Sequence, residues 1–401
     1  MASPAPSPRA PAAELEGPGV REAGYYQLLP NGKVQCDLCA HFCKINDGHV
    51  GVCGVRKASG GKLYTLVYAL PSAGHIDPVE KKPLYHFHPT TRVLSFGTIG
   101  CNMRCRHCQN FEISQARPDV TTVQGLPSNY LQQVPPEGIV GLIERVGAQG
   151  VAWTYNEPTI WFETNVVGCR LTKEAGYYTV WVSNGFATEE PMREIAPWLD
   201  AINVDVKAFT DDFYRKVANA RLQPVLDTVE VASDLGIHTE LTYLIIPGEN
   251  DDPREVRNFC RWVAEVPGEL TAVHFSRFHP DYKMMDKSET PVKTLEMAYT
   301  IAKQEGLKYV YNGNVVDPAR EQTYCHRCGA VNIKRRWFDT QPLFRIRPVG
   351  DDGEQGAFCR ECGTRLPIVL PRDAATRIRP SIGVIQSIYD ASNVPRRHLH
   401  K

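Results

Sequence analysis

The chain of 401 residues lacks net charge, because 45 basic residues balance 45 acidic ones. No global electric field therefore draws it to nucleic acid or to a membrane. It also lacks a run of about 20 apolar residues, the length that a membrane-spanning helix needs. Residues 1–24 lack the apolar segment of a secretory signal and are rich in proline and alanine, so we expect a disordered arm there.

The chain also lacks the even number of cysteines that a closed set of disulfides needs. The chain has 13, and an odd count argues against a closed disulfide framework. Eleven of them fall in three tight groups, which favours metal ligation and a reducing, cytoplasmic setting. The other two, Cys169 and Cys260, lie in predicted helical stretches and are expected to pack as small apolar residues. The groups are Cys36, Cys39, Cys43 and Cys53; Cys101, Cys105 and Cys108; and Cys325, Cys328, Cys359 and Cys362.

From residue 91 onward, short runs of β-branched and aromatic residues alternate with helical stretches. Runs without strict alternation are typical of strands buried on both faces. Repeated strand–helix units predict right-handed crossovers and a parallel sheet, either open or rolled into a barrel. The strands are expected at 91–97, 151–155, 177–183, 200–207, 238–246 and 271–278, the helices near 138–148, 157–175, 189–198, 211–235 and 253–265, and a last helix–strand pair at 291–305 and 308–311.

The central triplet, Cys101, Cys105 and Cys108, follows the first of these strands. In parallel α/β folds, active sites gather in the loops after the carboxyl ends of strands. Three thiolates spaced Cys-x3-Cys-x2-Cys can hold three irons of a [4Fe–4S] cluster and leave the fourth iron open to a ligand. The competing interpretation is a structural zinc site completed by His107. Zinc knuckles usually come as two separated pairs, so we favour the cluster.

The sequence around the triplet resembles the radical S-adenosylmethionine (SAM) superfamily. The stretch SFGTIGCNMRCRHCQNFEIS at 95–114 is similar to the radical SAM component of the AmmeMemoRadiSam system, a relative of the pyruvate formate-lyase activating enzymes. The resemblance covers roughly residues 30–330. It continues through CDLCAHFC at 36–43, DPVEKKP at 77–83, TYNEP at 154–158 and NVDVK at 203–207.

The resemblance implies a specific chemistry. The triplet would hold a [4Fe–4S] cluster, and SAM would chelate its open iron through the amino and carboxylate groups. One electron, from a donor such as flavodoxin or ferredoxin, would cleave the sulfonium C–S bond, and the 5′-deoxyadenosyl radical would take hydrogen from a substrate that the sequence does not name. The protein would supply orientation and exclusion of water. The family also implies Memo-like and AMMECR-like partner proteins.

Polar residues after the second and third strands are candidates for holding SAM. The resemblance assigns the amino group to Asn156 and Glu157, where the superfamily has a Gly-Gly-Glu-like segment whose glycines are absent here. Glu157 also suits the first turn of a helix, where a carboxylate is favoured by the helix dipole. Ser183 and Asn184 are assigned to the ribose or carboxylate, with an ordinary Asn-Gly turn as the alternative.

Two further pairs follow the later strands. Asp205 and Lys207 lie two residues apart in a strand and so point to the same side. The resemblance places them near SAM or the substrate, and the alternative is a salt bridge filling the barrel. Arg277 and His279 follow the sixth strand, where they would clamp an anionic substrate or the SAM carboxylate. A histidine in such a loop is more often simply solvated.

The two outer cysteine groups predict further metal sites. Two matched Cys-x2-Cys-Gly knuckles, at 325–329 and 359–363, predict an all-thiolate zinc ribbon that leaves no open position for catalysis. The first group has four thiolates between residues 36 and 53, and it would hold either zinc or an auxiliary iron–sulfur cluster. Its surroundings are predicted to have too few core residues to fold without a metal.

The ribbon is the basic part of the chain, since residues 321–401 carry a net charge of +6 and residues 1–320 a net charge of −6. Basic and aromatic residues between the knuckles would dock an acidic partner or RNA. The simpler interpretation, a solvated basic face, is the one we expect. These residues are Lys334, Arg335, Arg336, Arg345 and Arg347, interleaved with Trp337 and Phe344.

The predicted fold class is α/β, a partial (β/α)6 TIM-like radical SAM barrel with a cysteine-rich metal-binding segment before it and a zinc ribbon after it. Two classes of function compete: a radical SAM enzyme, either a glycyl radical activase or one that modifies RNA or a metabolite, and a non-catalytic, zinc-stapled binding protein. The expected segments are an arm at 1–24, the cysteine-rich segment at 25–88, the barrel at 89–320, the ribbon at 321–370 and a basic tail at 371–401.

Overall fold

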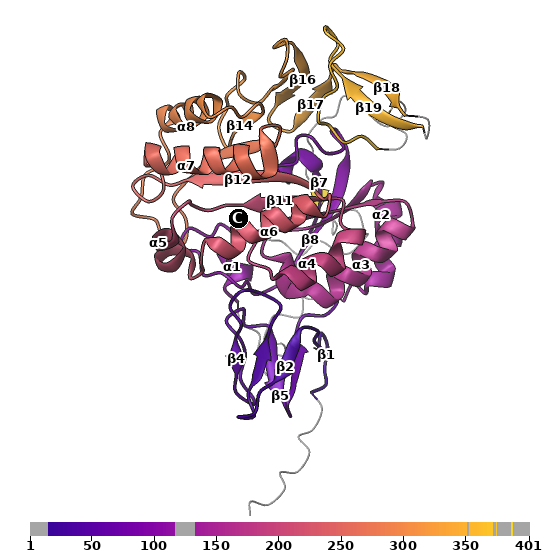
Figure 1. Cartoon of the computed structure of the whole chain (residues 1–401). Coiled ribbons are helices and arrows are strands. Elements are labelled where there is room, and N and C mark those ends of the chain that lie inside the picture. The colour runs from indigo at the N-terminus through magenta and orange to yellow at the C-terminus, as the bar shows by residue number, and fades with distance from the viewer. Residues whose placement is uncertain (1–14, 117–132, 351–352, 372–373, 375–385, 388–401) are drawn as a thin grey trace, which may run out of the picture.

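One long sheet forms the centre of the molecule (Figure 1). The computed structural model describes residues 15–116, 133–350, 353–371, 374 and 386–387. Within them the sheet has the order β14-β13-β12-β11-β10-β9-β8-β7-β20. Its strands are β7 (Ala73–Pro78), β8 (Arg92–Gly97), β9 (Gly150–Trp153), β10 (Tyr178–Ser183), β11 (Ala201–Asp205), β12 (His238–Ile245), β13 (Val273–Arg277), β14 (Val310–Gly313) and β20 (Gln386–Ser387).

Strands β8 to β14 are parallel neighbours in chain order, which confirms the predicted parallel α/β architecture. Every residue of β9 is buried, and so are all but one of β10, which explains the missing alternation in their sequences. Trp153 and Trp181 on these strands are among the largest fully buried side chains. The main hydrophobic core lies between the sheet and the helices that pack on it, as the contact of Trp153 with Cys169 of α3 (Phe162–Glu174) shows.

Helices connect the parallel strands (Figure 1). The helix expected at 211–235 is divided into three helical segments. Asn219 takes a left-handed conformation (φ 55°), which ends the second segment at Ala218. The helical segments are η1 (Val79–Lys81), α1 (Phe111–Ser114), η2 (Pro136–Gly138), α2 (Ile139–Val146), η3 (Pro158–Trp161), α3 (Phe162–Glu174), α4 (Glu189–Ile195), η4 (Ala196–Trp198), α5 (Asp211–Phe213), η5 (Tyr214–Ala218), α6 (Gln223–Asp234), α7 (Pro253–Val263), η6 (Ala264–Gly268) and α8 (Val292–Gln304). No helix among the described residues is long and apolar enough to cross a membrane.

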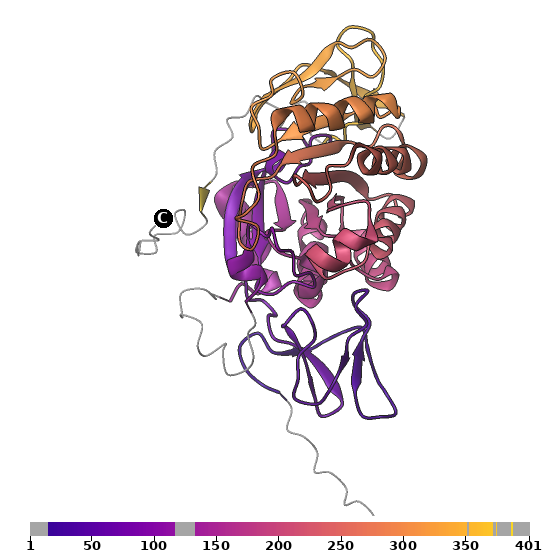
Figure 2. The same cartoon turned by 90° about the vertical axis from the view of Figure 1, so that its left-hand side faces the viewer.

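The cysteine-rich segment and the ribbon lie at opposite ends of the molecule (Figure 2). The first contains two small antiparallel sheets and the second contains a three-stranded sheet and a hairpin. The strands of the first are β1 (Arg21–Glu22), β2 (Tyr26–Leu28), β3 (Val34–Cys36), β4 (Lys44–Ile45), β5 (Arg56–Ser59) and β6 (Lys62–Thr65). Those of the second are β15 (Thr323–Tyr324), β16 (Val331–Arg336), β17 (Asp339–Pro342), β18 (Arg345–Val349) and β19 (Glu354–Phe358).

The expectation that the cysteine-rich segment has little core is wrong. Val34, Leu38, Val55 and Leu63 are buried and belong to the same hydrophobic cluster as the barrel. Val34 and Leu63 lie on strands of three and four residues, which are too short to show a period in the sequence, and Leu38 and Val55 lie outside the strands. The segment is thus packed onto the barrel by ordinary apolar contacts.

Three predicted boundaries also differ from the structure. Strand β1 pairs with β6, so an ordered strand lies inside the arm expected at 1–24, of which residues 1–14 are outside the described part. Strand β7 belongs to the main sheet rather than to the cysteine-rich segment. The tail expected at 371–401 contributes β20, which pairs with β7, although most of it is not described. Two-residue pairings leave no sequence pattern to detect.

The ribbon closes the side of the barrel between β14 and β7, which do not pair with each other in the described chain. Arg335 on β16 is only 4% exposed, and its guanidinium lies 4.1 Å from the centre of the Tyr85 ring. It donates to the Tyr85 carbonyl (2.8 Å) and to the Thr323 hydroxyl (2.7 Å). The Tyr85 ring in turn contacts Tyr311 of β14 at 4.8 Å. The predicted solvated basic face is therefore wrong for Arg335.

Candidate functional site

A cavity of about 530 Å³ lies at the carboxyl ends of the parallel strands. Its lining includes all three cysteines of the central triplet. Residues at or just after β9 to β14 complete it, which requires the sheet to curl around the cavity. One from each is Asn156, Ser183, Asp205, Leu244, Ser276 and Asn314. This is the position at which parallel α/β folds place active sites.

The triplet sits on a loop that packs tightly against the cysteine-rich segment. Gly100 has φ 87°, and a Cβ at this position would meet the Cys53 carbonyl at 2.7 Å, so only glycine fits. Cys101 accepts hydrogen bonds from the Met103 backbone N–H (3.4 Å) and from Asn184 Nδ2 (3.7 Å). These contacts fix the first thiol between β8 and the end of β10.

The chemistry of the three thiols suits metal ligation. Burial raises the pKa of Cys105 to about 11 and that of Cys101 well above its ordinary value. A neutral thiol is a poor ligand, whereas a bound cation removes the proton outright. Among the described residues, the ribbon cysteines are the only group of three or more possible metal ligands whose ligand atoms all lie within 4.8 Å of one another. The triplet with His107 is therefore too widely spaced for one zinc ion, and it fits irons that each take one thiolate.

His107 lies inside the lining rather than among metal ligands. It is 5% exposed, and its Nδ1 has no hydrogen-bond partner. Burial lowers its pKa to about 3, with a smaller contribution from nearby Lys207. A neutral imidazole with an open nitrogen is available to a bound ligand.

Asn156 and Glu157 play different parts. Asn156 lines the cavity, donating to the Gly100 carbonyl (2.7 Å) and accepting from the Thr98 N–H (3.2 Å). Glu157 is fully buried and is not part of the lining. Its carboxylate accepts from Thr159 N–H (2.9 Å), Thr159 Oγ1 (2.6 Å), Ser183 Oγ (2.8 Å) and Asn184 N–H (2.8 Å). The side chain thus ties the end of β9 to the end of β10.

The pairs assigned to SAM after the third and fourth strands all line the cavity. Asn184 also donates to Asn102 at 2.8 Å, beside the triplet. Lys207 Nζ lies 2.7 Å from Asp205 Oδ2, while Asp205 Oδ1 is buried without a partner. Burial alone would lower the pKa of Lys207, but the Asp205 carboxylate and the Cys105 thiol raise it, so the lysine is charged. Asp205 therefore keeps one oxygen free for a ligand.

Arg277 and His279 lie outside the cavity lining. Arg277 forms an ion pair with Glu289 (2.8 Å) and donates to the Thr290 carbonyl (2.9 Å). His279 is exposed, and its Nε2 lies 2.9 Å from Gln109 Nε2. The site as described does not bring these two residues together with the others, and their assignment stays a prediction.

A charged group near the cavity was not assigned from the sequence. Lys82 is 2% exposed and lines the cavity, and its Nζ lies 2.6 Å from Asp77 Oδ2. Tyr155 Oη donates to the same carboxylate oxygen (2.7 Å), and its backbone is left-handed (φ 72°). Burial lowers the pKa of Lys82 to about 8, although Asp77 opposes the shift. The only signal in the sequence was the charged stretch DPVEKKP.

The ribbon reaches the same cavity. Trp337 and Phe338, at the turn between β16 and β17, are part of the lining together with the triplet. Trp337 has a left-handed backbone (φ 57°), and its N–H donates to Glu321 Oε2 at 2.9 Å. The separation of ribbon from barrel in the sequence gave no indication of this contact.

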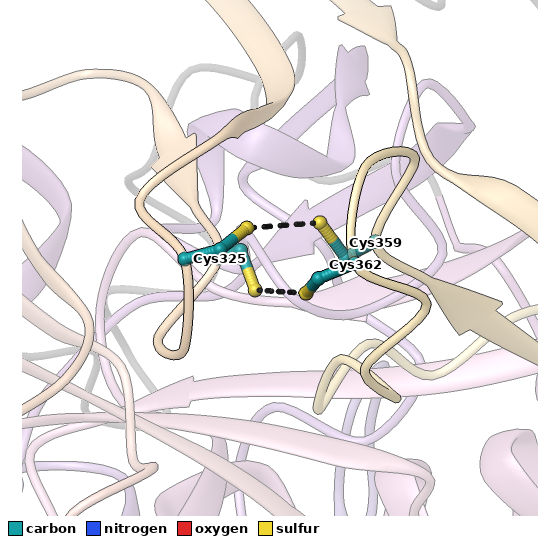
Figure 3. A group of neighbouring side chains, drawn as sticks. Cys325, Cys359 and Cys362 are labelled. Carbon is teal, nitrogen blue, oxygen red and sulfur yellow. Dashed lines mark hydrogen bonds between the residues drawn. The ribbon is translucent and has the colours of Figure 1, made fainter.

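The four ribbon cysteines form a compact group (Figure 3). The sulfurs of Cys325 and Cys362 are 3.7 Å apart, and those of Cys328 and Cys359 are 3.6 Å apart. Zinc–sulfur bonds of about 2.3 Å give a tetrahedron with edges of about 3.8 Å. The group therefore has the spacing of a four-thiolate site for a single metal ion.

Comparison with known proteins adds the family. The model of the Radical SAM superfamily matches residues 96–260. An uncharacterized protein of Methanocaldococcus jannaschii, MJ0808, is 41% identical over 351 residues, which are 88% of this chain and all of that protein. A pyruvate formate-lyase-activating enzyme of Clostridium pasteurianum is 22% identical over 47% of this chain and 80% of its own length. The crystal structure of a domain of the corresponding enzyme from Bacteroides vulgatus gives a TM-score of 0.38 at 14% identity, covering 42% of this chain and all of that domain.

Proposed function

Because this chain belongs to the radical SAM superfamily and is an enzyme of that class, we propose that it cleaves SAM reductively and uses the radical to abstract hydrogen from a substrate. The observation that carries the proposal is the cavity at the strand ends, which holds all three triplet cysteines together with Asn156, Ser183 and Asp205. A reduced [4Fe–4S] cluster held by these cysteines would supply the single electron for cleavage of the sulfonium C–S bond of SAM.

The chain's own residues bind and orient in this mechanism. Cys101, Cys105 and Cys108 would hold the irons. The free oxygen of Asp205 accepts from an ammonium or hydroxyl group, and the Lys207 ammonium beside it attracts a carboxylate. Ser183 and Asn184, assigned to the ribose or carboxylate, are held by Glu157.

The walls of the cavity limit access of water. Asn312 on β14 contributes to the lining and has a buried Oδ1 without a partner, so it offers one further acceptor inside the cavity. Trp337 and Phe338 cover the side that faces the ribbon. A radical formed in such a site is shielded from side reactions with solvent.

The finer assignments belong to the same proposal. We place the chain in the AmmeMemoRadiSam group on the motifs at 36–43 and 77–83, with flavodoxin or ferredoxin as electron donor and Memo-like and AMMECR-like proteins as partners. Zinc is the metal we assign to the ribbon, on the spacing of its sulfurs. Activation of a glycyl radical enzyme is a second candidate, supported by the similarity to an activating enzyme.

Anaerobic reconstitution with iron and sulfide tests the proposal. The protein, reduced with dithionite, should convert SAM to 5′-deoxyadenosine, measured by liquid chromatography. Cys105→Ala should abolish this conversion, whereas the control Cys260→Ala, a buried thiol far along the chain in α7, should retain it. Zinc in the triplet of the wild-type protein, with no SAM cleavage under strict anaerobiosis, would rule the proposal out.

A further inference from the structure

The four N-terminal cysteines form a second site of a different kind from the ribbon. We propose that Cys36, Cys39, Cys43 and Cys53 bind an iron–sulfur cluster, and that this cluster passes electrons to the one held by the central triplet. The electron-transfer part rests on the proposed function, whereas the presence of the cluster does not.

The surroundings of the four thiols favour bound metal. Cys36, Cys39 and Cys53 are buried and Cys43 is half-buried. Burial raises the pKa of Cys39, Cys43 and Cys53, and the backbone amides of His41, Val52 and Val55 oppose this shift by favouring the thiolates. N–H donors around sulfur stabilise thiolates and tune the metal that they hold.

The spacing of the four sulfurs differs from that of the ribbon cysteines and favours a cluster over a single metal ion. One zinc ion would need all four sulfurs at tetrahedron edges of about 3.8 Å, as the ribbon cysteines nearly have. No three of the N-terminal sulfurs lie within 4.8 Å of one another, although all four residues are described. In an iron–sulfur cluster the four thiolates are distributed over several irons and so stand farther apart. The N-terminal group shares this wider spacing with the triplet.

The site touches the loop that carries the triplet at three places. The Cys53 carbonyl lies against Gly100, where even a Cβ would not fit. Arg104, between Cys101 and Cys105, donates to the Val52 carbonyl. His41 Nε2 lies 2.6 Å from the Asn102 carbonyl. Ligands of the two sites thus belong to backbone segments in direct contact, which suits electron transfer between them.

An exposed residue adjoins the N-terminal site, where an electron donor can dock. Cys43 is half-buried, as Cys108 of the triplet is, and Phe42 beside Cys43 is 44% exposed. A reduced flavodoxin or ferredoxin would give one electron to the N-terminal cluster. That cluster would then give one electron to the triplet cluster and return to its oxidised state. Each transfer moves a single electron, and no bond is formed or broken.

Metal analysis of the anaerobically reconstituted protein tests the cluster. We expect about eight irons per chain, four for each cubane, and one zinc. The double variant Cys36→Ala/Cys53→Ala should lose about half of the iron and keep the zinc, and the control Cys260→Ala should lose none. About four irons and two zinc ions in the wild-type protein would overturn the proposal, and this measurement does not require any variant to fold.

Spectroscopy separates this proposal from the proposed function. After reduction, the variant Cys101→Ala/Cys105→Ala should retain an iron–sulfur electron paramagnetic resonance signal that SAM does not change. The wild-type protein should show an additional signal from the triplet cluster, and SAM should change only that signal. If the Cys101→Ala/Cys105→Ala variant shows no iron–sulfur signal while retaining the wild-type circular dichroism spectrum, the N-terminal cluster is excluded. SAM cleavage by the wild-type protein is a separate readout, so either idea can fail alone.

The choice of reductant tests the relay. With reduced flavodoxin, Cys36→Ala/Cys53→Ala should form 5′-deoxyadenosine at least tenfold more slowly than the wild type. With dithionite, a small reductant that reaches the cavity directly, the two rates should agree within about twofold. Wild-type rates with flavodoxin would refute the relay. Equal losses with both reductants would refute it too, since they would show that the substitutions damage the triplet site.

Discussion

Replacing Glu157 by glutamine tests whether this residue holds the site or binds the ligand. In the structure its two oxygens accept four hydrogen bonds from Thr159, Ser183 and Asn184, and none of its surface lines the cavity. Glutamine keeps one oxygen, which can serve the three donors that share Oε1. Its NH2 group then faces the N–H of Asn184, so two donors meet.

The cost follows from the lost hydrogen bond. An unsatisfied buried backbone N–H costs about 1–3 kcal/mol, so we expect the variant to lose about 2 kcal/mol of stability. For a cooperative unit of 150–250 residues this lowers Tm by roughly 4–8 °C. Because Asn184 also contacts Cys101 (3.7 Å), SAM cleavage should slow as well, with a change in KM for SAM of less than about tenfold.

Calorimetry of the anaerobic protein and the SAM concentration dependence of 5′-deoxyadenosine formation measure the two effects. Glu174→Gln is the matched control, since this glutamate is exposed in α3 and its ion pair with Arg170 contributes little. An unchanged Tm together with a hundredfold rise in KM would show that Glu157 binds SAM directly, as its sequence position indicated.

Three further perturbations follow from the structure. Arg335→Lys should cost about 3 kcal/mol of stability, because lysine lacks the fork of donors and the stacking on Tyr85 that the buried guanidinium provides. Arg336→Lys, at an exposed position on the same strand, should leave stability unchanged, and equal Tm values for the two variants would contradict the burial of Arg335. Cys362→Ser should remove zinc from the ribbon and lower Tm without lowering the iron content; zinc retained in full would refute the site. Lys82 has a pKa of about 8, so it loses its charge as the pH rises through that value, and activity that depends on this cation should fall above pH 8. If the pH–activity curve of Lys82→Met keeps the same inflection, the inflection does not belong to Lys82.

The sequence was sufficient for what local patterns encode. The runs of β9 and β10 predicted strands buried on both faces, and the spacing of the triplet predicted a loop after β8 at the cavity. It was insufficient where distant segments decide the role of a side chain. Arg335 looks like one of several surface cations, yet its partner Tyr85 is 250 residues away in the chain. Glu157 looks like a ligand residue, yet two of the four donors that occupy it come from the end of the next strand.

The ribbon lies against the open side of the barrel for a physical reason. The sheet does not close between β14 and β7 in the described chain, so the cavity at its strand ends needs a wall on this side, above all if it holds the proposed radical chemistry. The ribbon has a small apolar cluster of its own, in which two of the six core members are Cys325 and Cys359 of the proposed metal site. A bound metal supplies the rigidity that so small a core cannot, and Arg335 anchors the ribbon in the open side. Trp337 is then held at the cavity by Glu321 despite its strained backbone. Loss of the ribbon's metal should therefore loosen this wall of the cavity, although the triplet cysteines lie on another segment of the chain.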